Sequence, residues 1–186
     1  MPAGHAHGMA EMADMPMPEV KPAPAAPLPA AFQKQLQTVL EAYYAVQAAL
    51  AADDAAQAQQ AAADTQTALD AVKMELLRGD AHIAWMAHAK DLRAALDAAK
   101  TAGTDIAKLR VAFEPLSNAL IAALQGFGAP GDTPAYVLHC PMAFEGMGAD
   151  WLQAAQETRT PYFGSTMLKC GSVIGTLEPP GADAHE

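Results

Sequence analysis

The chain has 186 residues with only two cysteines, and 52% of its residues are hydrophobic, much of that fraction being alanine. This length fits one domain with a tail, and the alanine content favours helix. The formal net charge of −10 argues against nucleic acid or anionic lipid as a partner, and no run of about 18 apolar residues is present to span a membrane.

Residues 1–30 form a stretch rich in proline and alanine that lacks an apolar period, which predicts a disordered tail. The tail contains soft metal donors at His5, His7, Met9, Met12, Met15 and Met17. Imidazoles and thioethers at this density can collect copper or silver loosely, and the alternative is a low-complexity leader without a metal role. The folded domain is predicted over 31–178, followed by a frayed end over 179–186.

Four amphipathic segments follow the tail, with apolar residues at the three- and four-residue steps of a helix. The first helix is predicted to begin after Pro29, and the second to cover about 54–78. The third is predicted to end near Ala102, and the fourth to be capped by Thr104 and to contain Pro115. Because the turns between them are short, the sequence predicts an all-α fold, an antiparallel up-down four-helix bundle.

Residues 131–178 differ from the bundle in composition, because glycine, proline and aromatic residues concentrate there. Short β-prone pieces occur at 136–138 and 172–174, and a short helix is predicted over 148–156. We therefore expect a loop-rich C-terminal region appended to the bundle.

Both cysteines of this region stand close to a methionine. Cys140 and Met142 are separated by a proline, and Met167 precedes Cys170 by three residues. If the two loops are adjacent, two thiols and two thioethers face one point. Thiolate and thioether are soft ligands that select Cu(I) or Ag(I), whereas zinc rarely takes methionine.

His139 is a further candidate, either as a ligand or as a hydrogen-bonding group behind the ligands. It ranks below the four sulfurs, because neighbouring residues of a strand point to opposite faces. The residues leave two alternatives open. Cys140 and Cys170 can form a structural disulfide that stabilises the fold by roughly 3–4 kcal/mol, or they can cycle between dithiol and disulfide in redox chemistry.

Four stretches of the chain together resemble a known family: AALAADD, RVAFEPLSNALIAAL, HCPMAFEGMGADWLQ and TPYFGSTMLKCG. They are similar to a domain of formerly unknown function that occurs C-terminally on periplasmic adaptor subunits of heavy-metal efflux pumps, and as a stand-alone periplasmic protein. The resemblance covers about residues 32–176. It implies a helical domain with a copper or other heavy-metal role, and Cys140, Met142, Met167 and Cys170 match the sulfur positions of its motifs. One departure is Thr160, where the family usually has asparagine.

Other side chains with chemical potential are fewer. His82, Met86 and His88 share parts of one helix face and are either additional ligands or ordinary bundle residues. Trp151, Tyr162 and Phe163 are expected to cover the loops and exclude water. The carboxylates, among them Asp53, Asp54 and Glu114, are scattered on what is predicted to be a solvated face, with no catalytic pair.

These observations predict a periplasmic binding protein rather than an enzyme. It holds Cu(I), or Ag(I), through Cys140, Met142, Met167 and Cys170, with His139 as the fifth candidate. The expected partners are the metal ion and a heavy-metal efflux pump or copper chaperone, with no nucleic acid and no membrane span. The alternatives are a thiol-disulfide redox protein and a structural domain with a Cys140–Cys170 disulfide.

Overall fold

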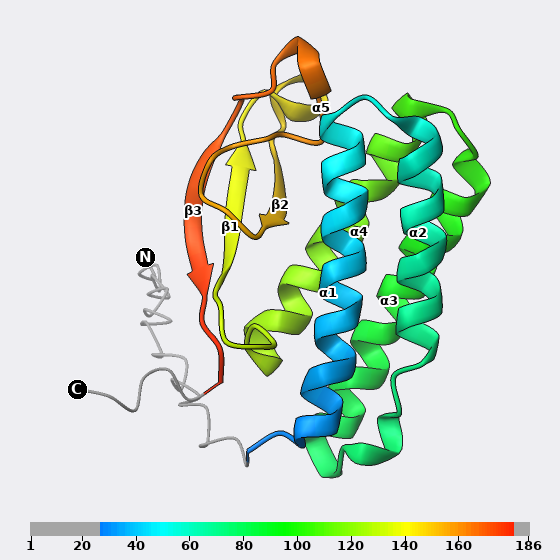
Figure 1. Cartoon of the computed structure of the whole chain (residues 1–186), viewed down its shortest axis with the longest axis vertical. Helices are drawn as coiled ribbons and strands as arrows, with labels where there is room; N and C mark the ends of the chain where they lie inside the picture. Colours follow the sequence, from blue (N-terminus) through cyan, green and yellow to red (C-terminus); the bar gives the residue numbers. More distant parts are fainter. Residues whose placement is uncertain (1–26, 181–186) are drawn as a thin grey trace, which may run out of the picture.

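A computed structural model of the chain describes residues 27–180 (Figure 1). The His/Met-rich tail predicted over 1–30 and the chain end predicted over 179–186 fall largely outside these residues. The described part combines a bundle of four long helices with a small antiparallel sheet along one side of it.

Four helices make up the bundle: α1 (Ala30–Ala51), α2 (Ala55–Asp70), α3 (Gly79–Ala102) and α4 (Ile106–Phe127). Each packs against the next along the chain, and α4 returns to contact α1. The predicted apolar stripes face the shared interior. Its largest fully buried side chains include Phe32, Leu36, Tyr43, Leu50, Leu69, Trp85, Leu92, Phe113, Leu116, Leu120 and Leu124. The predicted helical core is therefore confirmed.

The helix ends follow local side-chain chemistry, with two departures from the sequence prediction. Asp54 caps α2 by accepting a hydrogen bond from the Gln57 backbone N–H at 2.9 Å. At α4 the cap is Asp105 instead of the predicted Thr104, and Pro115 lies inside the helix as expected. The second helix ends at Asp70, well before the predicted 78, and a turn of 3-10 helix at Met74–Leu76 leads into α3.

The prediction of an all-α fold is wrong, because three strands follow the bundle. They are β1 (Ala135–Cys140), β2 (Ala149–Gln153) and β3 (Ser172–Leu177), in the antiparallel order β2-β1-β3. The β-prone pieces at 136–138 and 172–174 lie in β1 and β3. They are strands because β1 supplies hydrogen bonds on both of its edges, which isolated short segments lack.

The helix predicted over 148–156 is also wrong, because its central residues form β2. Alanine, leucine and glutamine favour helix, but pairing with β1 sets Trp151 opposite Leu138 and Asp150 opposite His139. Between these strands lie α5 (Ala143–Gly146), a single turn in which Phe144 and Glu145 have positive φ, and later the short 3-10 turn η2 (Gly164–Thr166).

The sheet is attached to the bundle through β2, which packs against α4 and α1, while β3 lies outermost (Figure 1). Trp151 and Leu152 of β2 are fully buried. Tyr43 of α1 connects the layers, since its hydroxyl pairs with the Ser117 hydroxyl of α4 at 2.7 Å and accepts the Leu152 backbone N–H at 3.0 Å. Burial raises the pKa of Tyr43 and keeps this hydroxyl neutral.

Candidate functional site

The two cysteines meet at the end of the sheet that lies beyond β1. Cys140 is the last residue of β1 and Cys170 comes two residues before β3. Their Cα atoms are 5.5 Å apart and their sulfurs form a disulfide. Cys140 is fully buried, whereas Cys170 is half-buried. The two distant loops therefore bring their thiol groups to one point, and the structure shows that pair in its oxidised form.

The two predicted methionine ligands border this pair but differ in exposure. Met142 directly precedes α5 and is 57% exposed. Met167 is half-buried, and its backbone carbonyl accepts the Cys170 N–H at 2.9 Å, which closes a tight turn around the second cysteine. Each thioether is thus anchored to the cross-linked loops by a short piece of chain.

His139 lies on the strand face opposite to Cys140, as strand alternation predicts. Its Nδ1 is 2.6 Å from the Asp150 carboxylate of β2, and both side chains are partly exposed. Gly148 provides the space for the imidazole, because a Cβ at that position would lie 2.9 Å from His139 Nε2. His139 therefore belongs to the outer face of the β1–β2 hairpin, away from the buried side of the disulfide.

Aromatic rings cover the inner side of the cysteine pair, in agreement with the prediction for two of the three residues named. Trp151 and Tyr162 are buried with ring centroids 5.9 Å apart, while Phe163 is only half-buried. The Trp151 ring packs so closely on Gly171, next to Cys170, that a Cβ there would lie 2.8 Å from it. Tyr162 donates its hydroxyl to the Asp150 carbonyl at 2.6 Å, and burial raises its pKa.

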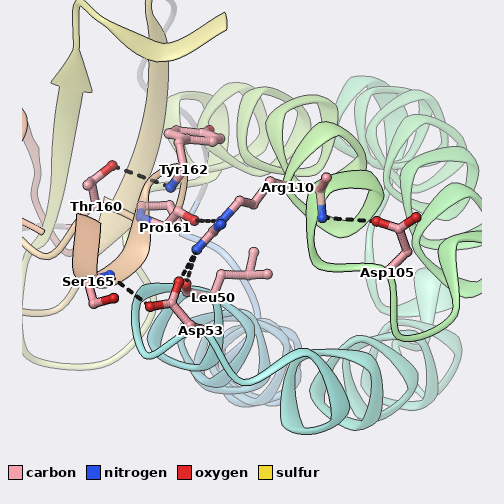
Figure 2. Close-up of polar contacts among 9 residues, drawn as sticks. Leu50, Asp53, Asp105, Arg110, Thr160, Pro161, Tyr162 and Ser165 are labelled. Atoms are coloured by element: carbon pink, nitrogen blue, oxygen red, sulfur yellow. Dashed lines mark hydrogen bonds and ion pairs between the residues drawn. The ribbon is translucent and has the colours of Figure 1, made fainter. Parts of the chain in front are cut away.

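A polar network attaches the loop before Cys170 to the bundle (Figure 2). Arg110 of α4 donates to the carbonyls of Pro161 at 2.9 Å and Leu50 at 3.0 Å, and it pairs with Asp53 at 2.6 Å. The second Asp53 oxygen accepts the Ser165 backbone N–H at 2.9 Å. The network therefore links the α1–α2 turn, α4 and the loop at 161–165.

Electrostatics in this network favour the charged form of Asp53. Hydrogen bonding from the Ser165 side chain and backbone N–H, followed by the Arg110 guanidinium, holds the pKa of Asp53 at about 2. Gly164 fits beside the pair with a φ of +57°, and a Cβ there would overlap Asp53 Oδ1 and the Arg110 guanidinium.

Sequence reasoning missed this network, although its parts lie in three of the stretches that carry the family resemblance. Asp53 is exposed, as predicted for the carboxylates, but its partners are separated from it by 57 and 112 positions. The departure at Thr160 leaves the loop braced: its hydroxyl oxygen accepts the Tyr162 N–H at 3.4 Å, and its own N–H donates to Leu168.

The remaining candidates have structural partners. His82 Nδ1 is 2.9 Å from the Met74 carbonyl, and the His88 ring lies edge-on to Phe127. Within residues 27–180 no group of three or more His, Cys, Asp and Glu side chains is arranged to hold a metal ion. None of the helices described is both long and apolar enough to cross a membrane.

Comparison with known proteins gives one family. The family described as "protein of unknown function (DUF3347)" matches residues 39–132. This stretch begins inside α1, continues past the end of α4 and stops before β1, so the five predicted metal ligands lie outside it. Comparisons with curated proteins and with solved structures gave no match.

Proposed function

The chain belongs to the DUF3347 family of proteins of unknown function, and we propose that this member binds a soft heavy-metal ion. In the reduced protein, the Cys140 and Cys170 thiolates hold Cu(I) or Ag(I), and the Met142 and Met167 thioethers are the next sulfur donors. The observation that carries the proposal is the meeting of cysteines 30 positions apart, with Cα atoms separated by 5.5 Å. Two thiolates in such a pair are ligands that select monovalent copper or silver.

Metal binding requires the dithiol form of the pair. A small-molecule or protein dithiol supplies two electrons and two protons: it breaks the Cys140–Cys170 bond, leaves two protein thiols and is itself oxidised to a disulfide. Attack on the half-buried Cys170 sulfur releases the buried Cys140 as leaving group. One Cu(I) ion then replaces the two thiol protons, so binding weakens as the pH falls.

The surroundings of the pair favour the lower oxidation state of copper. Trp151 and Tyr162 form an apolar wall on the bundle side, and such a wall keeps water from the ion. The partly exposed side, where Met142 lies, leaves one edge open for ligand exchange. A partner's sulfur displaces a thioether there before the thiolates release the ion.

The proposed setting is the periplasm, where the protein sequesters the ion or delivers it to a heavy-metal efflux pump or a copper chaperone. This part of the proposal rests on the resemblance of the Cys-Met motifs to those of the efflux-associated domain. The function is binding and transfer of an ion, without catalysis of a reaction.

A structural role for the disulfide is the second candidate, and the complete burial of Cys140 favours it. A buried sulfur is hard to reach for a reducing thiol. On this alternative the cross-link only fastens β1 to the loop before β3, and the methionines have no metal role.

A Cu(I) titration of the reduced full chain against a chromogenic chelator separates the two candidates. We expect Cys140→Ser to weaken Cu(I) binding by more than the roughly 10–100-fold that follows loss of an outer-shell contact. Met167→Leu is expected to cause a smaller loss. The matched control is Met86→Leu, which removes a methionine that is 51% exposed on α3.

Because every variant retains the N-terminal His and Met residues, differences between variants report on the proposed site alone. Equal Cu(I) affinities for the wild type, Cys140→Ser and Met86→Leu would contradict the metal-binding function and support the structural one.

A further inference from the structure

The outer face of the β1–β2 hairpin carries two long apolar side chains that do not pack into the protein. Met147 is 84% exposed and Met142 is 57% exposed, although buried positions are available throughout the adjoining core. A Gly148 N–H to Ala143 carbonyl bond of 3.0 Å closes the turn between them. Met142 and Met147 directly precede the two bonded residues, so both thioethers extend from the same end of the hairpin.

An imidazole on the same face has one nitrogen engaged by a carboxylate. His139 Nδ1 lies 2.6 Å from Asp150 Oδ1, across the paired strands. When the proton resides on Nδ1, this bond leaves the Nε2 lone pair free to bind a metal ion, the arrangement by which carboxylates orient histidine ligands. Nε2 lies over Gly148, the residue next to Met147, because a Cβ there would be 2.9 Å from it.

We propose that His139 Nε2, Met142 and Met147 form a second site for a soft monovalent cation, with Asp150 as positioning residue. Imidazole and thioether together suit Cu(I) and Ag(I), and neither thioether has to lose a proton to bind. The long, unbranched methionine side chains adapt to the ion without moving the backbone. The site uses no thiol, so it exists while Cys140 and Cys170 are cross-linked.

This independence makes the site testable apart from the function proposed above. The protein used is the full chain with its disulfide intact, checked by the absence of thiols that react with an alkylating reagent. The probe is Ag(I), which does not change oxidation state. Methionine methyl groups labelled with carbon-13 give site-resolved signals, which separate the hairpin from the N-terminal methionines.

We expect the Met142 and Met147 methyl signals to titrate together and to saturate with the same affinity for Ag(I). The Met86 methyl is the control: it is 51% exposed on α3 and has no such neighbours, so it should respond at least about tenfold more weakly. Met147→Leu, a change at an almost fully exposed position, should weaken the Met142 response to Ag(I) by at least about tenfold.

Asp150→Asn tests the positioning role through the same Ag(I) titration. It should weaken binding by about 10–100-fold while the Met142 and Met147 signals still move together, as expected for a group that orients a ligand without binding the ion. The proposal is overturned if Met147 follows the weak response of Met86, or if Met147→Leu leaves the Met142 titration unchanged. Loss of Cu(I) binding by the reduced thiols would not affect either outcome.

Discussion

In the helical bundle, apolar side chains at helical spacing meet in a closed core, whereas the three-stranded sheet is held by contacts between distant segments. The family match covers most of the bundle and stops before β1. The cysteines, the exposed methionines and His139 all lie in the sheet region. The comparison indicates that the bundle is a support, and that the candidate chemistry lies where local sequence preferences are weakest.

The sheet depends on this support at a few points. β2 is buried on α4 and α1, the Tyr43 hydroxyl bonds to its backbone, and Arg110 holds the loop that follows it. β3, by contrast, is exposed along most of its length. We therefore expect the outer part of the sheet to respond most strongly when these long-range contacts are removed.

The disulfide should have the largest effect on stability. Reduction should lower the free energy of unfolding by about 3–4 kcal/mol, because the cross-link closes a loop of about 30 residues in the unfolded chain. Urea unfolding with and without a phosphine reductant measures this. Amide hydrogen exchange should accelerate most in β3 and least in the core of α4. An unchanged unfolding midpoint after reduction, verified by mass spectrometry, would show that the cross-link does not secure the sheet.

Gly164→Ala should be the next most damaging change, costing about 3 kcal/mol. The left-handed backbone accounts for about 1 kcal/mol, and overlap of the new Cβ with the Asp53–Arg110 pair accounts for the rest. The control is Gly103→Ala, which has nearly the same φ of +58° with no atom within 4 Å of the added Cβ. It should cost about 1 kcal/mol in urea unfolding. Equal losses for the two variants would mean that the loop is not fitted against the pair.

Arg110→Ala should cost about 2 kcal/mol, since it leaves the Pro161 and Leu50 carbonyls and Asp53 without their donor. Arg93→Ala serves as the comparison, because its pair with Asp70 is exposed on both sides and should contribute about 0.5 kcal/mol. Thermal unfolding of both variants checks the difference. If Arg93→Ala proved as costly as Arg110→Ala, the network would have no special part in holding the loop.

The smallest expected effect is a dependence on acid pH. The pKa of Asp53 is about 2 in the folded protein, below the value of about 3.9 in an unfolded chain. The stability it contributes is therefore fully present above about pH 4 and is lost as the pH falls toward 2. The difference in urea midpoint between wild type and Asp53→Asn should shrink over that interval. A constant difference from pH 5 to pH 2 would contradict the assigned pKa.

The sequence predicts the bundle well because its information is local. Stripes such as Phe32, Leu36 and Tyr43 repeat at helical spacing, and an acidic residue caps α2. The sheet was missed because β2 consists of five residues without a strand pattern, and only its pairing with β1 makes it a strand. The same reason explains the boundary error after Asp70, where apolar residues continue to be buried without remaining helical.

The site was predictable only in part. Cysteines placed beside methionines pointed to two loops that meet, and the Cys140–Cys170 pair confirms that they do. Asp53, Arg110 and Gly164 were not found, because no short-range spacing relates residues so far apart. The exposure of Met147 likewise depends on the turn at Phe144 and Glu145, whose positive φ values the sequence does not announce.

Protection of the thiols by metal tests the central claim most directly. The reduced full chain is treated with an alkylating reagent, with and without one equivalent of Cu(I) beyond what the Cys140→Ser/Cys170→Ser variant takes up. Mass spectrometry then follows the modification of each cysteine. The proposed function predicts that Cu(I) slows alkylation of Cys140 and Cys170 together. Alkylation of the half-buried Cys170 at the same rate with and without Cu(I) would contradict it.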